Sequence, residues 1–185
     1  MADLEPVTAT LAGAFTHDPV WGWAFQGVAE IAACWRFCVR SAIPHGWVWS
    51  TADHEAATLW IPPGCAELSP QDEAALGPAL HAVMGERANV PLGAWPAFDE
   101  RHPTDEPHYY LSLLGTHPDH RGSGHGMQLL RENLAAIDAE HAAAYLESTN
   151  PVNMARYASV GFEPRDAFVV PGGTAVVTTM WRPAR

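Results

Sequence analysis

The chain has 185 residues, of which 48% are hydrophobic, and it carries a formal net charge of −11 at pH 7. This length and apolar content suit a single domain with a substantial core. The acidic balance argues against a nucleic-acid partner, because a phosphate backbone requires a basic protein face. It fits either electrostatic attraction of a cationic substrate or solubility alone.

Compartment signals are few. No apolar run approaches the ~20 residues that span a membrane, and the segment Met1–Pro6 shows neither the basic region nor the apolar region of a signal peptide. Cys34 and Cys38 lie one helical turn apart beside aromatic residues, which predicts reduced thiols in a core. All ten basic residues are arginine, which favours a bacterial protein from a GC-rich genome. We therefore expect a cytoplasmic location.

Two helices are predicted near the start of the chain. The first covers Pro6–Phe15, where apolar residues recur at helical spacing, and the second covers Gln26–Ser41, before Pro44 ends it. The segment 20–25 between them is too aromatic for an ordinary loop.

A β-hairpin is predicted next, with strands at 46–50 and 56–61. Between Leu68 and His102 the chain has few β-branched residues and several prolines and glycines. Two short helices, at about 70–85 and 92–101, fit this region best.

The central motif is a strand, a glycine turn and a helix. An apolar strand covers 108–115, the chain turns at Pro118, glycines stand at 122, 124 and 126, and an amphipathic helix follows. Glycine lets the backbone present its N–H groups, and a helix start adds unpaired N–H groups and a positive dipole end. This combination predicts a phosphate site. A nucleotide P-loop is excluded because it needs a lysine, and the chain has none.

The last part of the chain continues the alternation of strands and helices. A strand at 143–147 follows a crossover helix and should run parallel to the strand at 108–115. Asn150 caps a further helix, which has Pro151 at its first position and ends near Gly161. A short strand begins at Phe162, and a terminal hairpin covers 168–170 and 174–181.

Arg121-x-x-Gly124-x-Gly126, placed after such a strand, resembles the acyl-CoA pyrophosphate loop of the GNAT superfamily of N-acetyltransferases. The alternative is a glycine turn that binds nothing. The resemblance continues to Gly161-Phe162 and is clearest over about 107–162. Within the superfamily the chain is most similar to puromycin N-acetyltransferase-like antibiotic-modifying enzymes, on short matches at Phe15, Asp18-Pro19, Leu59-Trp60, Pro62, Glu106-Pro107, Pro118-Asp119-His120 and Leu146-Glu147-Ser148.

The resemblance implies one domain over 1–185, with its CoA-binding core at about 107–162. The implied fold is α/β (α+β), with a mixed central sheet of about seven strands flanked by helices. Acetyl-CoA is the implied cofactor, bound by Leu114, Gly115, Thr116, Arg121, Gly122, Ser123, Gly124, His125, Gly126 and Asn153. The aromatic residues Phe15, Trp21, Trp23 and Phe25 are either acceptor contacts or core.

The resemblance, together with the chemistry of acetyl transfer, implies the remaining roles. The attacking amine must be neutral, so a base must take its proton; Glu147 and His108 are the candidates, each with a structural role as the alternative. The oxyanion needs a backbone N–H, which the segment 114–116 can supply. Tyr157 lies one turn after Asn153 and is positioned to protonate the departing sulfur, because a phenol with a pKa of ~10 keeps its proton at neutral pH. His117 and His120 lack a third ligand at suitable spacing, so no metal is expected.

These inferences predict an enzyme that transfers acetyl from acetyl-CoA to the primary amine of a small molecule, such as an aminonucleoside or another antibiotic. Acetylation of a peptide or protein amine, and a non-catalytic acyl-CoA-binding sensor, are the alternatives. The expected partner is the small-molecule amine, with no nucleic acid and no membrane. A homodimer is left open.

Overall fold

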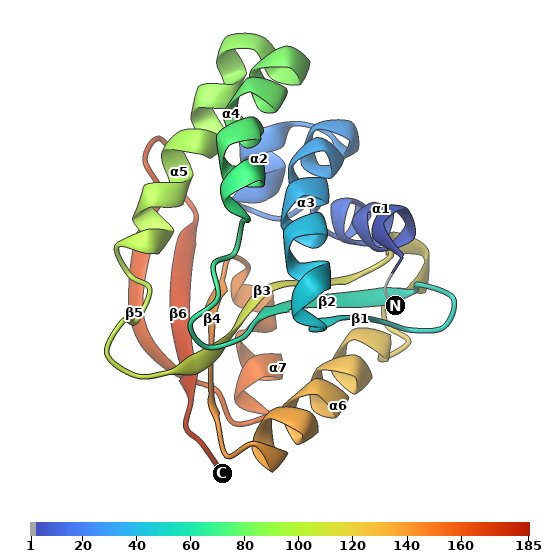
Figure 1. Ribbon diagram of the computed structural model, residues 1–185, viewed down its shortest axis with the longest axis vertical. Helices are drawn as coiled ribbons and strands as arrows, with labels where there is room; N and C mark the ends of the chain where they lie inside the picture. The colour runs from blue at the N-terminus through green and yellow to red at the C-terminus, as the bar shows by residue number, and fades with distance from the viewer. Residues whose placement is uncertain (1–2) are drawn as a thin grey trace.

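The computed structural model describes residues 3–185 and contains a six-stranded mixed sheet in the order β1-β2-β3-β4-β6-β5 (Figure 1). Its strands are β1 (Val48–Ser50), β2 (Ala56–Ile61), β3 (His108–Thr116), β4 (Ala143–Ser148), β5 (Glu163–Val169) and β6 (Val176–Arg182). Only β3 and β4 run parallel, as the crossover helix between them predicts. The sequence predicts about seven strands, close to the six found. One strand fewer is found because the two predicted strands that begin at Phe162 and at Phe168 form one continuous strand, β5.

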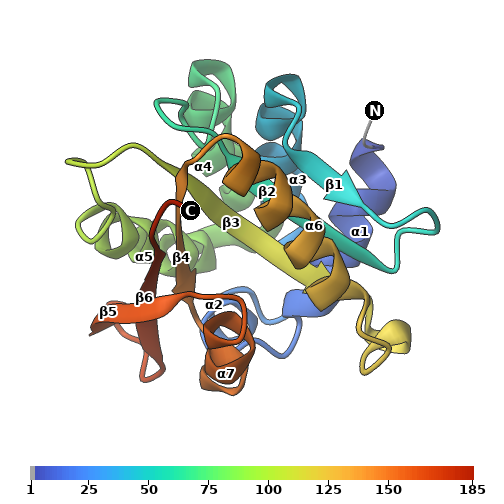
Figure 2. The same ribbon diagram turned by 90° about the horizontal axis from the view of Figure 1, so that it is seen from below.

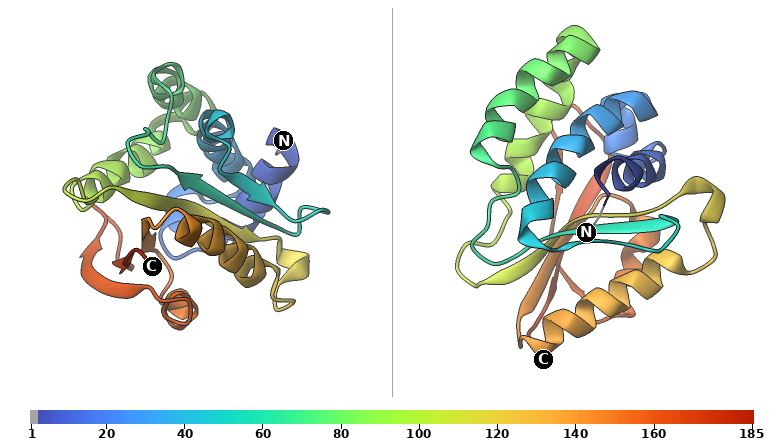
Figure 3. Two further views of the ribbon diagram at one scale, coloured as in Figure 1. Left: turned by 60° about the horizontal axis from the view of Figure 1, so that its bottom comes forward. Right: turned by 45° about the vertical axis from the view of Figure 1, so that its right-hand side comes forward.

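Helices cover both faces of the sheet (Figures 2 and 3). The α-helices are α1 (Leu4–Phe15), α2 (Trp21–Phe25), α3 (Val28–Ala42), α4 (Pro70–Met84), α5 (Asn89–Asp99), α6 (His125–Ala139) and α7 (Met154–Ala158). Short 3₁₀ turns occur at Ile43–His45, Gly85–Ala88, Pro118–His120 and Pro151–Asn153. The aromatic segment 20–25, which is too aromatic for an ordinary loop, forms the helix α2. The helix predicted after Asn150 is split into a 3₁₀ turn and α7, although Asn150 caps it as expected by accepting from the Val152 N–H.

Two buried apolar clusters match the two faces. The larger joins α1 to α5 with β2 and part of β3. The smaller places α6 and α7 against the other side of the sheet, through Leu130, Leu134 and Ile137 of α6. The apolar spacing of the helix predicts these three positions and Met127 as one buried face, and Met127 is only partly buried against the cluster.

A buried amide fixes α6 to the sheet. Asn133 is fully buried, and its Oδ1 accepts from the Thr58 hydroxyl at 2.7 Å and from the Trp60 indole N–H at 2.9 Å. Two hydrogen bonds to one oxygen inside an apolar layer specify one position of the helix on the strand. Because α6 begins at the glycine turn, this contact also fixes where that turn lies.

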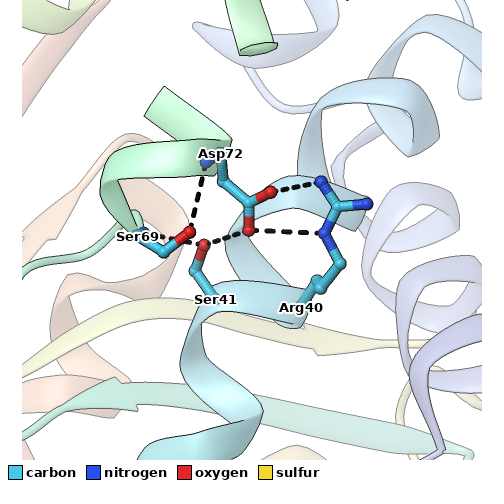
Figure 4. Close-up of polar contacts among 4 residues, drawn as sticks. All are labelled: Arg40, Ser41, Ser69 and Asp72. Carbon is cyan, nitrogen blue, oxygen red and sulfur yellow. Dashed lines mark hydrogen bonds and ion pairs between the residues drawn. The ribbon is translucent and has the colours of Figure 1, made fainter. Parts of the chain in front are cut away.

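A second polar network joins the end of α3 to the start of α4 (Figure 4). The Ser69 hydroxyl caps α4 by accepting from the Asp72 N–H at 3.1 Å. The Asp72 carboxylate accepts from Ser41 at 2.6 Å and from the Arg40 guanidinium. The network anchors α4, which packs with α5 on the same face of the sheet as α1 and α3.

Among residues 3–185, no helix is both long enough and apolar enough to cross a membrane.

Candidate active site

The parallel strands β3 and β4 separate in the middle of the sheet. They are paired only from His108 opposite Ala143 to Leu111 opposite Leu146. Beyond this point β3 follows β2, and β4 follows β6 (Figure 2). In the part of the chain that the structure describes, the edge of β3 after Leu111 therefore has no strand beside it and is open to a ligand.

A β-bulge marks the point of separation. Leu111 pairs with Trp60 and Leu113 pairs with Leu59, so Ser112 is the extra residue. Residues two apart in a strand normally share a face, yet Leu111 packs with the α6 cluster and Leu113 with the α1–α5 cluster. The bulge thus re-aims the side chains of β3 where the strands part, which is a common use of bulges beside active sites.

A cavity of about 1090 Å³ occupies this separation. One end is lined by the glycine turn and by Arg121 and Arg156, and the other by aromatic and acidic side chains, among them Glu67 and Glu147. The cavity is therefore cationic where a phosphate would lie and anionic where an amine would lie.

The glycine turn has the backbone that the sequence pattern predicts. Gly122 and Gly124 both have φ of +85°, and a Cβ at either position would meet nothing within 4 Å. Their backbone conformation, rather than crowding, is what favours glycine. Gly124 is the residue that precedes α6, so the unpaired N–H groups of that helix start beside the cavity.

Two other glycines allow neighbouring helices to lie close to the end of β3. A Cβ on Gly126 would lie 2.6 Å from the Thr116 hydroxyl oxygen, and one on Gly115 would lie 2.6 Å from the Cβ of Ala14. The first turn of α6 therefore lies against the end of β3. The Arg121 guanidinium is held on the same side by donating to the Ala14 carbonyl at 2.9 Å.

These features fit a CoA-type ligand. Open N–H groups at a helix start suit a diphosphate, and an unpaired strand edge suits the amides of a pantetheine arm. Of the predicted cofactor residues, eight line the cavity: Leu114, Gly115, Thr116, Arg121, Gly122, Gly124, Gly126 and Asn153. Ser123 and His125 do not, and the His125 ring faces His120 instead.

Tyr157 lines the cavity from α7, one turn after Asn153, as predicted. Its ring contacts Phe162 edge-on, with 6.2 Å between centroids. Burial, with a smaller contribution from the negative charge of Asp18, raises the pKa of Tyr157 to about 12. The phenol therefore keeps its proton over the whole neutral range.

Glu147 lies at the point where β4 leaves β3, with only 2% of its side-chain surface exposed. Its Oε1 has no hydrogen-bond partner among the described residues. Burial raises the pKa of Glu147 to about 8, and the Tyr145 and Tyr110 side chains oppose the rise only in part. A carboxyl group with a pKa near neutrality can exchange a proton under physiological conditions.

The second predicted base, His108, is engaged through both ring nitrogens. Its Nδ1 lies 2.7 Å from the Glu106 carbonyl, which only accepts, so Nδ1 carries the hydrogen. In the neutral pair its Nε2 then accepts from His102 Nε2 at 3.1 Å. His102 is left with a lone pair on Nδ1, 3.9 Å from Glu147 Oε1. Burial and the neighbouring His108 lower the pKa of His102 to about 4, so its ring is neutral at pH 7.

Packed aromatic side chains line the acidic end. Trp21 lies 5.3 Å, centroid to centroid, from each of Trp35, Trp95 and Phe98. Among the four predicted aromatic contacts, Phe15 and Trp21 line the cavity, whereas Trp23 and Phe25 do not. Phe25 is fully buried in the core. Trp23 points away to the turn between β5 and β6, near Gly172 and Gly173.

Sequence reasoning missed part of this end of the cavity, namely Asp18, Glu67, Trp95, Phe98, Asp99 and His102. Glu67 follows β2 and reaches the cavity through a hydrogen bond from the Ser112 hydroxyl. Trp95, Phe98, Asp99 and His102 belong to the region 68–102, where the helices were predicted but the direction of their side chains was not. A signal was present in the short run of aromatic and acidic residues from Trp95 to Glu100.

Comparisons with known proteins agree with this geometry. Residues 35–162 match the model of the Acetyltransferase (GNAT) family. The fold is similar to a structure described as histone acetyltransferase HPA2 and related acetyltransferase from Corynebacterium glutamicum, with a TM-score of 0.67, 23% identity, and coverage of 100% of this chain and 93% of that one. It is also similar to a polyamine N-acetyltransferase of Drosophila melanogaster, with a TM-score of 0.65, 14% identity, and coverage of 99% and 97%. At these identities the structures establish the fold.

Proposed function

The chain belongs to the acetyltransferase (GNAT) family and is an acetyl-CoA-dependent N-acetyltransferase, and we propose that its acceptor is the primary amine of a small molecule. The supporting observation is the lining of the cavity, which joins the glycine turn to an end with aromatic and acidic side chains. A cationic amine is matched by the carboxyl groups there.

Acetyl-CoA supplies the acetyl thioester when it is bound. In the proposed arrangement the N–H groups at Gly122, Gly124 and the start of α6 hold the diphosphate. The unpaired edge of β3 at 114–116 bonds to the pantetheine arm, and one of its N–H groups faces the acetyl carbonyl. Asn153 lines the same cavity and would bond to the arm.

The proposed base is Glu147. Its carboxylate takes one proton from the acceptor ammonium, and the neutral nitrogen forms the new bond to the carbonyl carbon. The nitrogen then loses its second proton to solvent as the carbon–sulfur bond breaks. The unpartnered Oε1 and the raised pKa support this role. His108 is less suited, because the lone pair that it would use already accepts from His102.

The proposed acid is Tyr157. Its hydroxyl gives a proton to the sulfur as the thiolate leaves, and solvent returns to it the second proton that the amine nitrogen releases. The position of Tyr157 on the cavity wall beside Asn153, together with a pKa of about 12, supports donation rather than acceptance of a proton.

A finer proposal concerns the physiological acceptor, for which an aminonucleoside or another amine-bearing antibiotic is the class proposed. The support is the aromatic wall of Trp21, Trp35, Trp95 and Phe98, because flat rings stack well on indole and phenyl faces. Such a reaction would serve self-resistance or detoxification.

The test is a screen for release of free CoA from acetyl-CoA. The panel contains aminonucleosides, aminoglycosides, simple alkylamines and short peptides with free N-termini, and Glu147→Gln serves as the inactive control. Turnover with small amines and none with peptides is expected. Turnover only with peptides would overturn the small-molecule assignment, and acetyl-CoA binding without any turnover would favour a sensor.

A further inference from the structure

Glu67 is a second carboxyl group in the acceptor end of the cavity. It lies in the loop after β2, half-buried, and the Ser112 hydroxyl donates to its Oε1. Burial raises the pKa of Glu67, while the Ser112 and Trp95 side chains favour its charged form. Among residues 3–185 no arginine or histidine forms an ion pair with it.

Glu67 and Glu147 flank the separation of the strands. Ser112, which holds Glu67, follows Leu111, and Glu147 follows Leu146, the last residue paired with Leu111. The two carboxyl groups are close enough for the charge of Glu67 to raise the pKa of Glu147. Two acidic groups that share a poorly hydrated space without a cation are costly, because each disfavours ionisation of the other.

One buried acceptor in the cavity wall lacks a partner. Glu147 Oε1 has no hydrogen-bond partner in the described chain, and Glu147 lines the cavity. Buried polar atoms without a partner are uncommon in folded proteins. An acceptor of this kind suits a ligand that donates a hydrogen bond, as an ammonium group does.

Resting on the proposed function, we propose that the acceptor carries two protonated nitrogens, one that reacts at Glu147 and one that Glu67 binds as a fixed cation. Glu147 cannot do both, because it becomes a neutral acid once it takes the proton. In the proposed arrangement Glu67 takes no proton from the reacting nitrogen, and the Ser112 hydroxyl that donates to its Oε1 favours its charged form. The class of acceptor is therefore a short aliphatic diamine or a larger molecule that contains one.

The walls suit the rest of such a molecule. Trp21, Trp95 and Phe98 pack together beside the carboxyl groups and offer apolar faces to a methylene chain. Aromatic faces also attract ammonium groups at short range. Asp99, whose pKa burial raises, extends the acidic lining toward the rim of the cavity.

The competing arrangement is a single ammonium group held between both carboxyl groups. This arrangement makes a different prediction, because removal of the Glu67 carboxylate would then weaken the binding of monoamines and of diamines equally. The comparison of the two amine types therefore distinguishes the arrangements.

The experiment measures binding by calorimetry and turnover by CoA release for α,ω-diaminoalkanes of three to six carbons, each beside the monoamine of equal length. Wild type, Glu67→Gln and a control, Glu132→Gln, are compared. Glu132 is exposed on α6 outside the cavity, so its substitution removes the same charge elsewhere. Thermal unfolding establishes that each variant is folded.

In wild type, at least one diamine is expected to bind about 10- to 100-fold more tightly than its monoamine, as one charged hydrogen bond would give. Glu67→Gln should abolish this advantage and change monoamine binding less than threefold, while Glu132→Gln keeps it. Equal binding of the two amine types by wild type, or equal weakening of both by Glu67→Gln, would overturn the proposal. Diamine-selective binding without CoA release would uphold the second cation site and count against the proposed acetyl transfer.

Discussion

The Thr149 hydroxyl donates to Asp18 Oδ2 at 2.6 Å and so joins the end of β4 to the turn before α2. The other oxygen of Asp18 accepts from the N–H groups of Val20 and Trp21, at 3.0 and 2.9 Å. One carboxylate therefore fixes the helix that carries Trp21 relative to the strand that carries Glu147. The aromatic wall and the proposed base are placed by the same contact.

Thr149→Val should lower the free energy of unfolding by about 1–3 kcal/mol, because it leaves a buried carboxylate oxygen without its donor. Urea unfolding at pH 7 measures the change. Thr174→Val is the control, since Thr174 is exposed in the turn before β6, and it should change stability by less than about 0.5 kcal/mol. Equal effects of the two substitutions would show that the contact to Asp18 is not stabilising.

The order of elements was largely predictable because its signals are local. Alternation and helical spacing located the strands and helices, and Pro118, Asn150 and Gly161 marked turns and caps through properties of single residues. The shape of the glycine turn was predictable for the same reason, because the glycines and the helix that follows them are adjacent in the sequence.

The acceptor end could not be predicted because it depends on distant contacts. The bulge at Ser112 exists only when β3 pairs with β2, and it decides where Glu67 is held. His102 reaches Glu147 from the loop between α5 and β3. Trp23 and Phe25 have the same aromatic character as Trp21, and only the direction in which α2 packs separates them.

Gly124→Val should weaken acetyl-CoA binding at least tenfold, because a β-branched residue disfavours the φ of +85° that aims the loop N–H groups. Calorimetry with acetyl-CoA is the measurement. Gly46→Val is a matched control, since Gly46 has φ of +76°, would meet nothing within 4 Å with a Cβ, and lies outside the cavity. Unchanged affinity in folded Gly124→Val would contradict the assignment of the diphosphate to this turn.

Asp72 should make stability depend on acid pH. The Arg40 guanidinium holds the pKa of the Asp72 carboxyl below its usual range. A depressed pKa stabilises the folded state above the unfolded value of ~3.9, and this stabilisation is lost as pH falls through the folded value. Asp72→Asn should cost about 1–3 kcal/mol at pH 7, and the difference from wild type should shrink below pH 4. Urea unfolding at pH 7, 5 and 3 measures this, and a difference that is constant with pH would rule out the ion pair as its source.

The proposed base predicts a pH profile. With a pKa of about 8, Glu147 is mostly protonated at pH 7, so kcat/KM should rise with pH and level off above about 8. Deprotonation of the amine adds a rise of its own, and Glu147→Gln separates the two. The variant should lose about 10²–10⁴-fold in kcat and retain only the part of the profile that belongs to the amine. If the rise in kcat/KM near pH 8 is unchanged in Glu147→Gln, that rise belongs to the titration of another group.

Tyr157→Phe tests the proposed acid, because it keeps the ring that packs on Phe162 and removes only the hydroxyl. A phenol with a pKa of about 12 is protonated at every pH at which the base works, so it can donate in each turnover. Loss of the donor should lower kcat by about 10²–10⁴-fold and leave acetyl-CoA affinity unchanged.

Steady-state kinetics with a good acceptor, together with calorimetry, measures both quantities for Tyr157→Phe. Tyr109→Phe is the matched control, because Tyr109 is buried outside the cavity and donates to Glu140 at 2.6 Å. That variant should lose stability and keep its kcat. If Tyr157→Phe stays within about threefold of wild type, the thiolate leaves without a protein acid, since the ring alone cannot supply the proton.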